Sequence, residues 1–371
     1  MPPTCPEGGR RVAGGSRVRG RHPRARAVGR SVRAACALLA AACAGEPRPS
    51  RDLAERFADP ARHLVHIGLD GDTSQRAMLG VVLGARLTAS GSHLVVLDLV
   101  PPHVKVFDRQ GLLHAAFLEQ GGGPAESKTA VAIAIAGDSG VLVAESGSRF
   151  QLFDLEGRLR GTLRATGISP LAVLDACGGA WMGYGPHFSG GRGEWLHALD
   201  SAPAASGPQW TFADALSADF IAMGRPYGAV RGRDSLFVWH ELGAQRGVLS
   251  IPCTPGPARL RALDARDAPA PPSFEPTKRA LAVKEGARIS AGLAAPRDTV
   301  VIARIILGKS AESSVTELVM PFTEPRRIVR IPGAFVLRDS RPGVGVLVEA
   351  MEPVPQVFLM PEDSLLALFR R

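Results

Sequence analysis

Asparagine is absent from this chain of 371 residues, and its five cysteines and nine histidines show no zinc-ligand spacing. The sequence also lacks the GxSxG elbow that marks α/β-hydrolases. These absences leave no visible catalytic or metal-binding constellation, so we expect neither a resident metal nor a cofactor. A mean hydropathy of +0.07 also argues against a polytopic membrane protein.

The positive charge is confined to one end of the chain. The formal net charge is +9, and the first 33 residues hold nine arginines and a single acid, Glu7. The remaining 338 residues carry 35 basic and 34 acidic side chains. A nucleic-acid-binding protein is expected to show a basic face on its folded domain. We therefore expect no nucleic-acid partner.

A short apolar segment near the N-terminus has the pattern of an export signal. Arg30 and Arg33 precede the uncharged residues 34–42, which are too few to cross a bilayer as a helix. We interpret residues 1–43 as an upstream extension plus signal peptide, and residues 44–62 as a linker. This N-terminal segment is expected to be disordered, and the chain is expected to be exported.

The end of this segment offers two routes of processing. Cys43 follows small residues and precedes Ala44 and Gly45, so the segment resembles a bacterial lipoprotein signal. The resemblance implies cleavage before Cys43, lipidation of its thiol and anchoring to a membrane. A plain signal peptide, cut near Ala42 or Ala44, is the alternative. The predicted location is therefore the periplasm, free or as a membrane-anchored lipoprotein.

Removal of the N-terminal segment leaves two cysteines in the domain, Cys177 and Cys253. An oxidising compartment permits a disulfide between them. We favour two buried free thiols, because unpaired cysteine is among the most buried residue types.

One pattern recurs along the chain at a spacing of 46 residues. Residues 95–108 (VVLDLVPPHVKVFD) align without gaps to residues 141–154 (VLVAESGSRFQLFD). Each copy has an apolar strand, a small turn, a second strand ending in Phe-Asp, a glycine turn and a third strand. The spacing holds again at residues 198–200 (ALD). Repeated units of roughly 40–50 residues with about four short strands are typical of β-propeller blades.

Weaker copies follow at residues 220–252, at 299–306 with 315–322, and at 334–338 with 345–350 and 356–361. We interpret residues 254–276, rich in Pro and Ala, as a break containing a surface loop. Six units predict an all-β, six-bladed β-propeller over residues 63–371, with about four antiparallel strands per blade. The isolated strand at residues 63–69 is placed to complete the last blade, although residues 365–369 could fill that place.

The first two units share a form that belongs to a known family. The residues that carry it are Val96-Leu97-Asp98, Val104-Lys105-Val106-Phe107-Asp108, Gly111, Phe117, Gly121-Gly122-Gly123-Pro124 and Glu126. This form resembles NHL-repeat-like six-bladed propellers, especially the bacterial lipoprotein-type members. The resemblance implies a binding scaffold without assigned chemistry. Gluconolactonase-like hydrolases and peptide-amidating lyases are relatives of this fold, but the absence of Asn removes the Asn ligands of the lactonase pattern.

Structural roles explain the recurring acids and glycines. Asp98, Asp108 and Asp154 are expected to accept hydrogen bonds from turn amides. Residues 121–124 are not followed directly by Lys-Ser or Lys-Thr, so we expect an inter-blade corner and no phosphate loop. The pair His240-Glu241 has the chemistry of a general base or a metal ligand, but the sequence offers it no third partner.

A glycine-rich insertion at residues 185–193 interrupts the third unit. The residues that flank it suit a binding surface on a long loop: Tyr184, His187, Phe188, Arg192 and Trp195. Partial burial of these side chains against a neighbouring blade is the alternative.

These patterns together predict a monomeric, non-enzymatic binding or scaffold module of the bacterial cell envelope. The propeller would present loops to a protein, peptide or glycan partner. The alternative is a propeller-type hydrolase or lyase with a divalent metal in the central channel. Convergent Asp, Glu or His side chains in that channel would favour the enzyme, whereas a lining of small apolar residues, as residues 131–136 indicate, would not.

Overall fold

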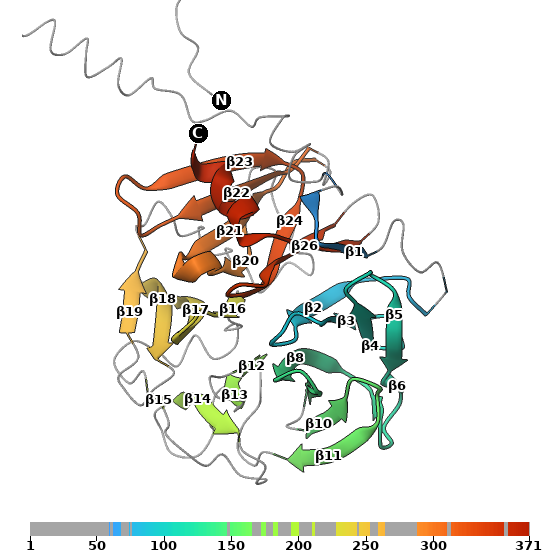
Figure 1. Ribbon diagram of the computed structural model, residues 1–371. Coiled ribbons are helices and arrows are strands. Elements are labelled where there is room, and N and C mark those ends of the chain that lie inside the picture. Colours follow the sequence, from blue (N-terminus) through green and yellow to red (C-terminus); the bar gives the residue numbers. More distant parts are fainter. Residues whose placement is uncertain are drawn as a thin grey trace, which may run out of the picture. The chain divides into compact units, whose positions relative to one another are not determined.

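The computed structural model describes residues 59, 62–67, 74, 76–146, 149–164, 172–175, 181–184, 194–199, 210–211, 228–242, 245–252, 259–263, 288–309, 313–351 and 355–370 (Figure 1). Strands dominate these residues, and the helices among them are α3 (Glu362–Ala367) and two short 3-10 turns. The predicted all-β class is confirmed. No helix within the described ranges is long and apolar enough to cross a membrane.

Four sheets of four antiparallel strands follow one another in chain order. The first contains β2 (Val82–Leu87), β3 (His93–Asp98), β4 (Val104–Asp108) and β5 (Leu113–Phe117). The second contains β8 (Ala130–Ala136), β9 (Gly140–Glu145), β10 (Arg149–Asp154) and β11 (Leu159–Arg164). The third contains β12 (Ala172–Asp175), β13 (Trp181–Tyr184), β14 (Glu194–Leu199) and β15 (Trp210–Thr211). The fourth contains β16 (Gly228–Arg231), β17 (Ser235–Leu242), β18 (Gln245–Pro252) and β19 (Arg259–Ala262).

The last sheet has eight strands and consists of two such groups joined edge to edge. One group is β20 (Arg288–Ala294), β21 (Val301–Ile306), β22 (Val315–Met320) and β23 (Arg327–Pro332). The other is β24 (Phe335–Arg341), β25 (Gly345–Ala350), β26 (Gln356–Met360) and β1 (Val65–Ile67). The groups meet where β20 runs parallel to β24, at the single pair Gly292 and Leu337. Gly292 has a φ of +100°, and a Cβ on it would lie 1.9 Å from the Leu337 carbonyl oxygen.

The first strands of the groups contact one another in a closed series. β2 contacts β24 and β8, β12 contacts β8 and β16, and β16 contacts β20 and β24. This arrangement of antiparallel four-stranded groups is a β-propeller (Figure 1). The described residues form six such groups, and the number of blades in the complete chain stays a prediction.

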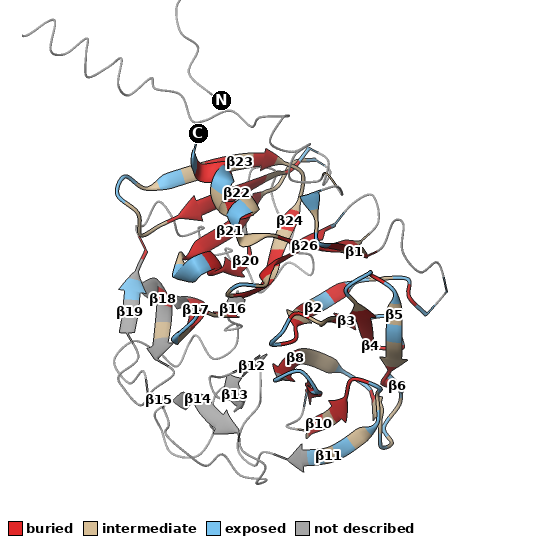
Figure 2. Ribbon diagram, in the orientation of Figure 1, coloured by how far each residue is buried: buried red, intermediate tan, exposed pale blue. Residues whose placement is uncertain are grey.

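Alternate residues of one strand pack against different neighbouring sheets. Leu94 and Val96 of β3 join a core cluster that includes Leu347 of β25. Val95 and Leu97 join another cluster with residues of β8 and β9. Both faces of β3 are therefore buried, which explains why its sequence is continuously apolar. In Figure 2 the buried residues of β3 are coloured red.

The first described strand closes the last group. β1 pairs antiparallel with β26, with Val65 opposite Leu359 and Ile67 opposite Val357. The prediction that residues 63–69 complete the last blade is therefore confirmed at Val65–Ile67. The alternative at residues 365–369 is wrong, because these residues continue α3 into a 3-10 turn and pack against the core.

One predicted break contains a strand. The break with a surface loop that the sequence predicts at residues 254–276 contains β19 (Arg259–Ala262), which pairs with β18. The surrounding Pro and Ala residues mask this four-residue strand in the sequence. The unit predicted at residues 299–322 is also incomplete. The observed group has two further strands, β20 before this range and β23 after it.

We predict that Gly292→Ala will destabilise the protein by about 3 kcal/mol or more, because it combines a positive φ with a backbone clash. Gly343→Ala is the matched control, since Gly343 has a φ of +74° and nothing within 4 Å of the added Cβ. The control should lose only about 1 kcal/mol. Urea unfolding measures the free energy of unfolding of both variants. If both lose the same amount, the contact between residue 292 and the Leu337 carbonyl oxygen does not cause the loss.

Candidate functional site

The predicted binding loop lies mostly outside the described residues. Tyr184 ends β13, Trp195 is the second residue of β14, and the Tyr184 backbone pairs with that of Leu196. The remaining loop residues, His187, Phe188 and Arg192, fall outside the described residues, as do Cys43, Cys177 and Cys253. The two strands bring the ends of the insertion together, and its binding role stays a prediction.

The backbone of the His240-Glu241 pair lies within the fourth sheet. His240 and Glu241 lie on β17, opposite Gly247 and Arg246 of β18. Among the residues that the structure describes, no group of three or more His, Cys, Asp or Glu side chains is placed to hold a metal ion. The first strand of the second sheet, β8, carries only Ala, Val and Ile.

The recurring aspartates bind backbone amides, as predicted. Asp108 accepts hydrogen bonds from the N–H groups of Gln110 and Leu112, at 2.8 and 2.9 Å. Asp154 accepts one from the N–H of Arg158 at 2.8 Å. Each carboxylate thereby closes the turn after its strand, and neither is free to act as a ligand at these atoms.

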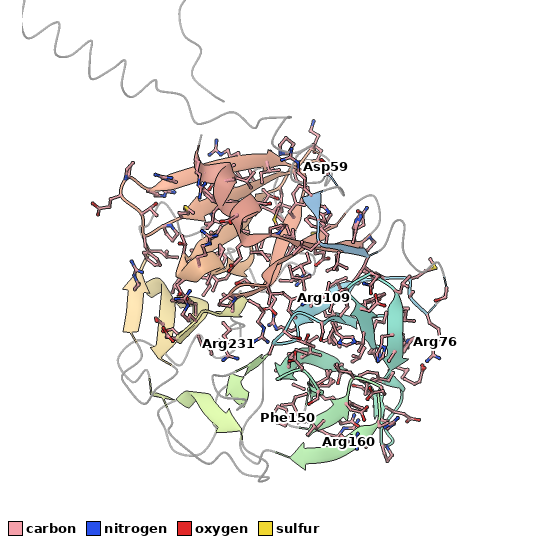
Figure 3. All side chains as sticks on the ribbon, in the orientation of Figure 1. Asp59, Arg76, Arg109, Phe150, Arg160 and Arg231 are labelled. Atoms are coloured by element: carbon pink, nitrogen blue, oxygen red, sulfur yellow. The ribbon has the colours of Figure 1, made fainter. Side chains whose placement is uncertain are left out.

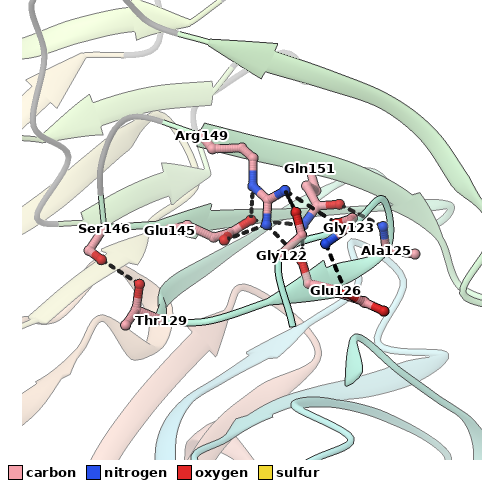
Figure 4. A network of polar contacts seen from close by, with 9 residues as sticks. All are labelled: Gly122, Gly123, Ala125, Glu126, Thr129, Glu145, Ser146, Arg149 and Gln151. Carbon is pink, nitrogen blue, oxygen red and sulfur yellow. Dashed lines mark hydrogen bonds and ion pairs between the residues drawn. The ribbon is translucent and has the colours of Figure 1, made fainter. Parts of the chain in front are cut away.

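The glycine-rich segment at residues 121–124 is an inter-blade corner, flanked by a short parallel pair of strands, β6 (Glu119–Gln120) and β7 (Glu126–Ser127). Figure 4 shows the polar network behind it. Arg149 donates to the Glu145 carboxylate and to the Glu126 carbonyl oxygen. Gln151, fully buried, bonds Glu145, the Glu126 carbonyl and the Ala125 N–H. The network fixes the corner, in which the Gly121 N–H donates to the Ser127 carbonyl oxygen and the Gly123 N–H donates to the Glu126 carboxylate.

The structure brings together two apolar segments that no sequence motif marks as a site. Leu99 donates its N–H to the Val81 carbonyl oxygen at 2.9 Å. A Cβ added to Gly80 would lie 2.4 Å from Cγ2 of Val100. Residues 78–83 and 99–100 therefore lie side by side at one end of the first sheet.

Five aliphatic side chains of these segments face solvent, with exposed fractions between 37% and 63%. We call this set the apolar rim: Met78, Val81, Leu83, Leu99 and Val100. The residues between them anchor the segments, because Val82 is buried and Leu79 packs against the same core cluster. The rim accounts for most of the exposed large hydrophobic side chains among the described residues.

A buried carboxylate holds the two segments in place. Asp98, at the end of β3, accepts hydrogen bonds from the N–H groups of Gly80, Val81 and Val100, at 2.8 to 3.0 Å. Lys105 lies 2.5 Å from the same carboxylate and donates to the Met78 carbonyl oxygen at 2.8 Å. Both side chains are almost completely buried. The turn role predicted for Asp98 is confirmed, and the ion pair extends it to a second loop.

The ionisation of Asp98 follows from these contacts. Burial opposes the charged form, but hydrogen bonds from Lys105, Gly80 and Val100 outweigh it and hold the pKa of Asp98 below its ordinary value. The carboxylate is therefore charged at neutral pH and neutralises the Lys105 ammonium. An unpaired charge at this depth would be costly, so the pair fixes the position of both partners.

A third contact ties the rim to the last group. Arg338 of β24 pairs with Glu349 and donates to the carbonyl oxygens of Val82 and Leu83. Burial raises the pKa of Glu349, and the Arg338 guanidinium opposes this shift. The Arg338 guanidinium thus offsets the burial of the Glu349 carboxylate, and the same group donates to the backbone of residues 82 and 83 in the first rim segment.

The sequence does contain a signal for the rim. Residues 78–83 (MLGVVL) and 99–102 (LVPP) include no charged or polar side chain. Such runs are normally assigned to a core, and only the structure separates the buried from the exposed members. Chemically the rim has no nucleophile and no acid or base, so it can act only by burying apolar surface.

We predict that Asp98→Asn will lower the free energy of unfolding by about 3 kcal/mol at pH 7, because Lys105 loses its counter-charge. Since the folded-state pKa of Asp98 is depressed, the ion pair's contribution is present above the unfolded pKa of about 3.9. It is lost as pH falls through the folded pKa. Denaturant titrations should therefore show that the difference in free energy of unfolding between wild type and variant becomes smaller below about pH 4.

Asp108→Asn serves as the control, because its amide oxygen can still accept the turn hydrogen bonds. It should cost less than about 1 kcal/mol. A difference between wild type and Asp98→Asn that does not change on acidification would contradict the proposed charge pairing.

No protein-family model and no curated protein matches this sequence. Solved structures with a similar arrangement include a Bacteroides fragilis protein assigned as exported, with 8% identity, coverage of 77% of this chain and 83% of that chain, and a TM-score of 0.49. A DUF4221-family member from Bacteroides vulgatus has 9% identity, coverage of 80% and 95%, and a TM-score of 0.45. A gluconolactonase from Xanthomonas campestris has 14% identity, coverage of 76% and 88%, and a TM-score of 0.44. At these values the similarities carry no conclusion about family or activity, and the resemblance to NHL-type propellers stays a prediction.

Proposed function

We propose that this chain is a non-enzymatic binding module of the bacterial cell envelope, in which the β-propeller is a rigid scaffold and the apolar rim is the contact surface. The observation that carries the proposal is the apolar rim itself. Five exposed aliphatic side chains gather on two adjoining segments, and a buried ion pair fixes those segments. The largest exposed apolar patch on a soluble protein is often a functional surface.

The fixed backbone supports binding over catalysis. Asp98 and Lys105 hold the segments from below, while Leu79 and Val82 anchor them in the core. A preformed surface loses little conformational entropy when a partner docks. The rim contributes no group that could transfer a proton or attack a substrate.

The cellular location rests on the N-terminal sequence. Arg30 and Arg33, the uncharged segment at residues 34–42 and Cys43 support export, with either cleavage alone or lipidation at Cys43. We therefore place the proposed function in the periplasm, on a free or lipid-anchored propeller of the six-bladed NHL type.

We predict that the full chain, expressed with its own N-terminus in a bacterial host, will capture an envelope protein and that Leu99→Asp with Val100→Asp will reduce the captured amount at least tenfold. Two new carboxylates would have to be desolvated on contact. Leu112→Asp is the matched control, because Leu112 is 51% exposed and lies beyond the other end of β4. Capture is quantified by mass spectrometry of cross-linked complexes.

Deletion of the insertion at residues 185–193, which leaves β14 (Glu194–Leu199) intact, forms a separate arm of this experiment. Loss of capture in the deletion alone would assign the contact to that loop and refute the rim as the binding surface. Equal capture by wild type and every variant would refute both contact surfaces.

A further inference from the structure

We propose that His93 and His114 together bind one divalent transition-metal ion, at the end of the first sheet opposite the apolar rim. His93 is the first residue of β3, and His114 is the second residue of β5. Sequence spacing does not reveal this pair, because the two residues come together across strands. The site goes beyond the proposed binding function and does not depend on it.

The two imidazole rings have the separation that a shared metal ion requires. Their centroids lie 5.0 Å apart, with an angle of 56° between the ring planes. A metal ion bound to one nitrogen of each ring, with bonds of about 2.0–2.1 Å, places the centroids about 4.5 to 5.2 Å apart in square-planar or tetrahedral geometry. The observed separation falls within this range, so an ion can be accommodated without moving the two strands.

Hydrogen bonding orients the ring of His93 and leaves one of its nitrogens for a ligand. Its Nδ1 lies 3.0 Å from the Ser92 hydroxyl oxygen, which lies 3.2 Å from the Thr88 hydroxyl oxygen. When Nδ1 donates its proton to Ser92, Nε2 presents the lone pair that a metal ion binds. Metal-ligating histidines are commonly held by such a hydrogen bond from the other ring nitrogen.

A β-bulge places His114 beside His93. The register of β4 and β5 shifts between Val106 and Phe107, which leaves His114 as the extra residue of β5. Bulges of this kind re-aim a side chain. His114 is exposed, and its ring makes no hydrogen bond or ion pair to any residue that the structure describes. Its nitrogens are therefore available to an ion from solvent.

The surroundings of the pair favour a cation. Asp108 lies directly opposite His93 in the β3–β4 ladder, so the two side chains share one face of the sheet. Burial and the nearby His114 lower the pKa of His93, which favours the neutral ring that binds a metal. Three carboxylates act on the charge of the same ring: Asp108, Asp138 and Glu156. Their negative charge stabilises a bound dication.

The second sheet carries a fixed cation at the equivalent position. The 46-residue spacing relates His114 to Arg160 and Asp108 to Asp154. Arg160, labelled in Figure 3, is also the extra residue of a bulge, and its guanidinium pairs with the Asp154 carboxylate. Asp108 makes no ion pair with any described residue. A metal ion at His114 would supply the positive charge that Arg160 supplies in the second sheet.

The ligand chemistry selects the type of ion. Imidazole nitrogen suits Zn²⁺, Cu²⁺ and Ni²⁺, whereas Ca²⁺ and Mg²⁺ take oxygen ligands. Two protein ligands leave the other coordination positions to water. We therefore expect reversible binding that is weaker than at a structural site with four protein ligands.

A second histidine pair provides a matched control. The rings of His63 and His66 lie 5.6 Å apart, but His63 stacks on Phe358 at 3.9 Å. Nε2 of His66 lies 3.0 Å from the Gln356 side-chain oxygen. These rings are engaged where β1 closes the last group, so we do not expect them to share an ion.

The test titrates the full chain with NiCl₂ in a calorimeter. The wild type should show a saturable site from which ZnCl₂ displaces Ni²⁺ and CaCl₂ does not. His114→Arg, which copies the residue of the second sheet, should weaken Ni²⁺ binding about tenfold or more, and His93→Gln should do the same. His66→Gln should leave the affinity unchanged.

Thermal unfolding separates loss of the ion from loss of the fold. Without metal, His114→Arg should unfold at the wild-type temperature or above it, because its guanidinium can pair with Asp108. Ni²⁺ should raise the unfolding temperature of the wild type and of His66→Gln, but not that of His114→Arg.

The absence of saturable Ni²⁺ binding by the wild type, or equal affinity in the wild type and both variants of the pair, would overturn the inference. A loss of affinity confined to His66→Gln would assign the ion to the other pair, and displacement by CaCl₂ would assign it to oxygen ligands. Either result also overturns the inference. Capture of an envelope protein tests the apolar rim at the other end of the sheet, so the two proposals can fail separately.

Discussion

The buried pair of Asp98 and Lys105 is the interaction on which the architecture of the rim depends. Its carboxylate receives three backbone N–H groups from two segments, and its ammonium group binds a carbonyl of the first segment. Replacing such a pair by apolar side chains is often neutral or stabilising, so net stability does not explain its presence. Its effect here is positional, because it pairs polar backbone groups that would otherwise need water as a hydrogen-bond partner.

Other sheets solve the same problem with different residues. The 46-residue spacing places Gln151 of the second unit at the position of Lys105 in the first. Gln151 joins Arg149 and Glu145 in the network that holds the glycine corner. In β21 and β22, Arg304 and Glu317 form a buried pair that Arg330 extends. Each four-stranded group with both faces covered needs internal partners for its polar atoms. The repeat fixes the positions of these partners more strictly than their residue types.

Much of the fold follows from the sequence, because apolar strands and glycine turns repeat at a fixed spacing. The closing strand β1 was also predictable, since an isolated strand ahead of the repeats has no partner nearby in the sequence. Strands β19, β20 and β23 were missed, because edge and inner strands carry mixed polar patterns that resemble loops. The Gly292 contact was invisible for a different reason: the close approach of β20 to β24 joins residues 45 positions apart in two separate units.

The rim shows why an exposed apolar surface can escape prediction even when its residues are conspicuous. Met78 and Val82 belong to the same apolar run, yet one is exposed and the other buried. The distinction depends on Asp98, which lies 16 to 20 positions further along the chain and draws the run across the end of its sheet. A sequence pattern reports that a segment is apolar, whereas exposure depends on which distant polar group holds its backbone. Because that group is charged and buried, the backbone that carries the exposed side chains is held in a fixed position. A partner of the kind proposed would have to complement these side chains by shape and apolar area.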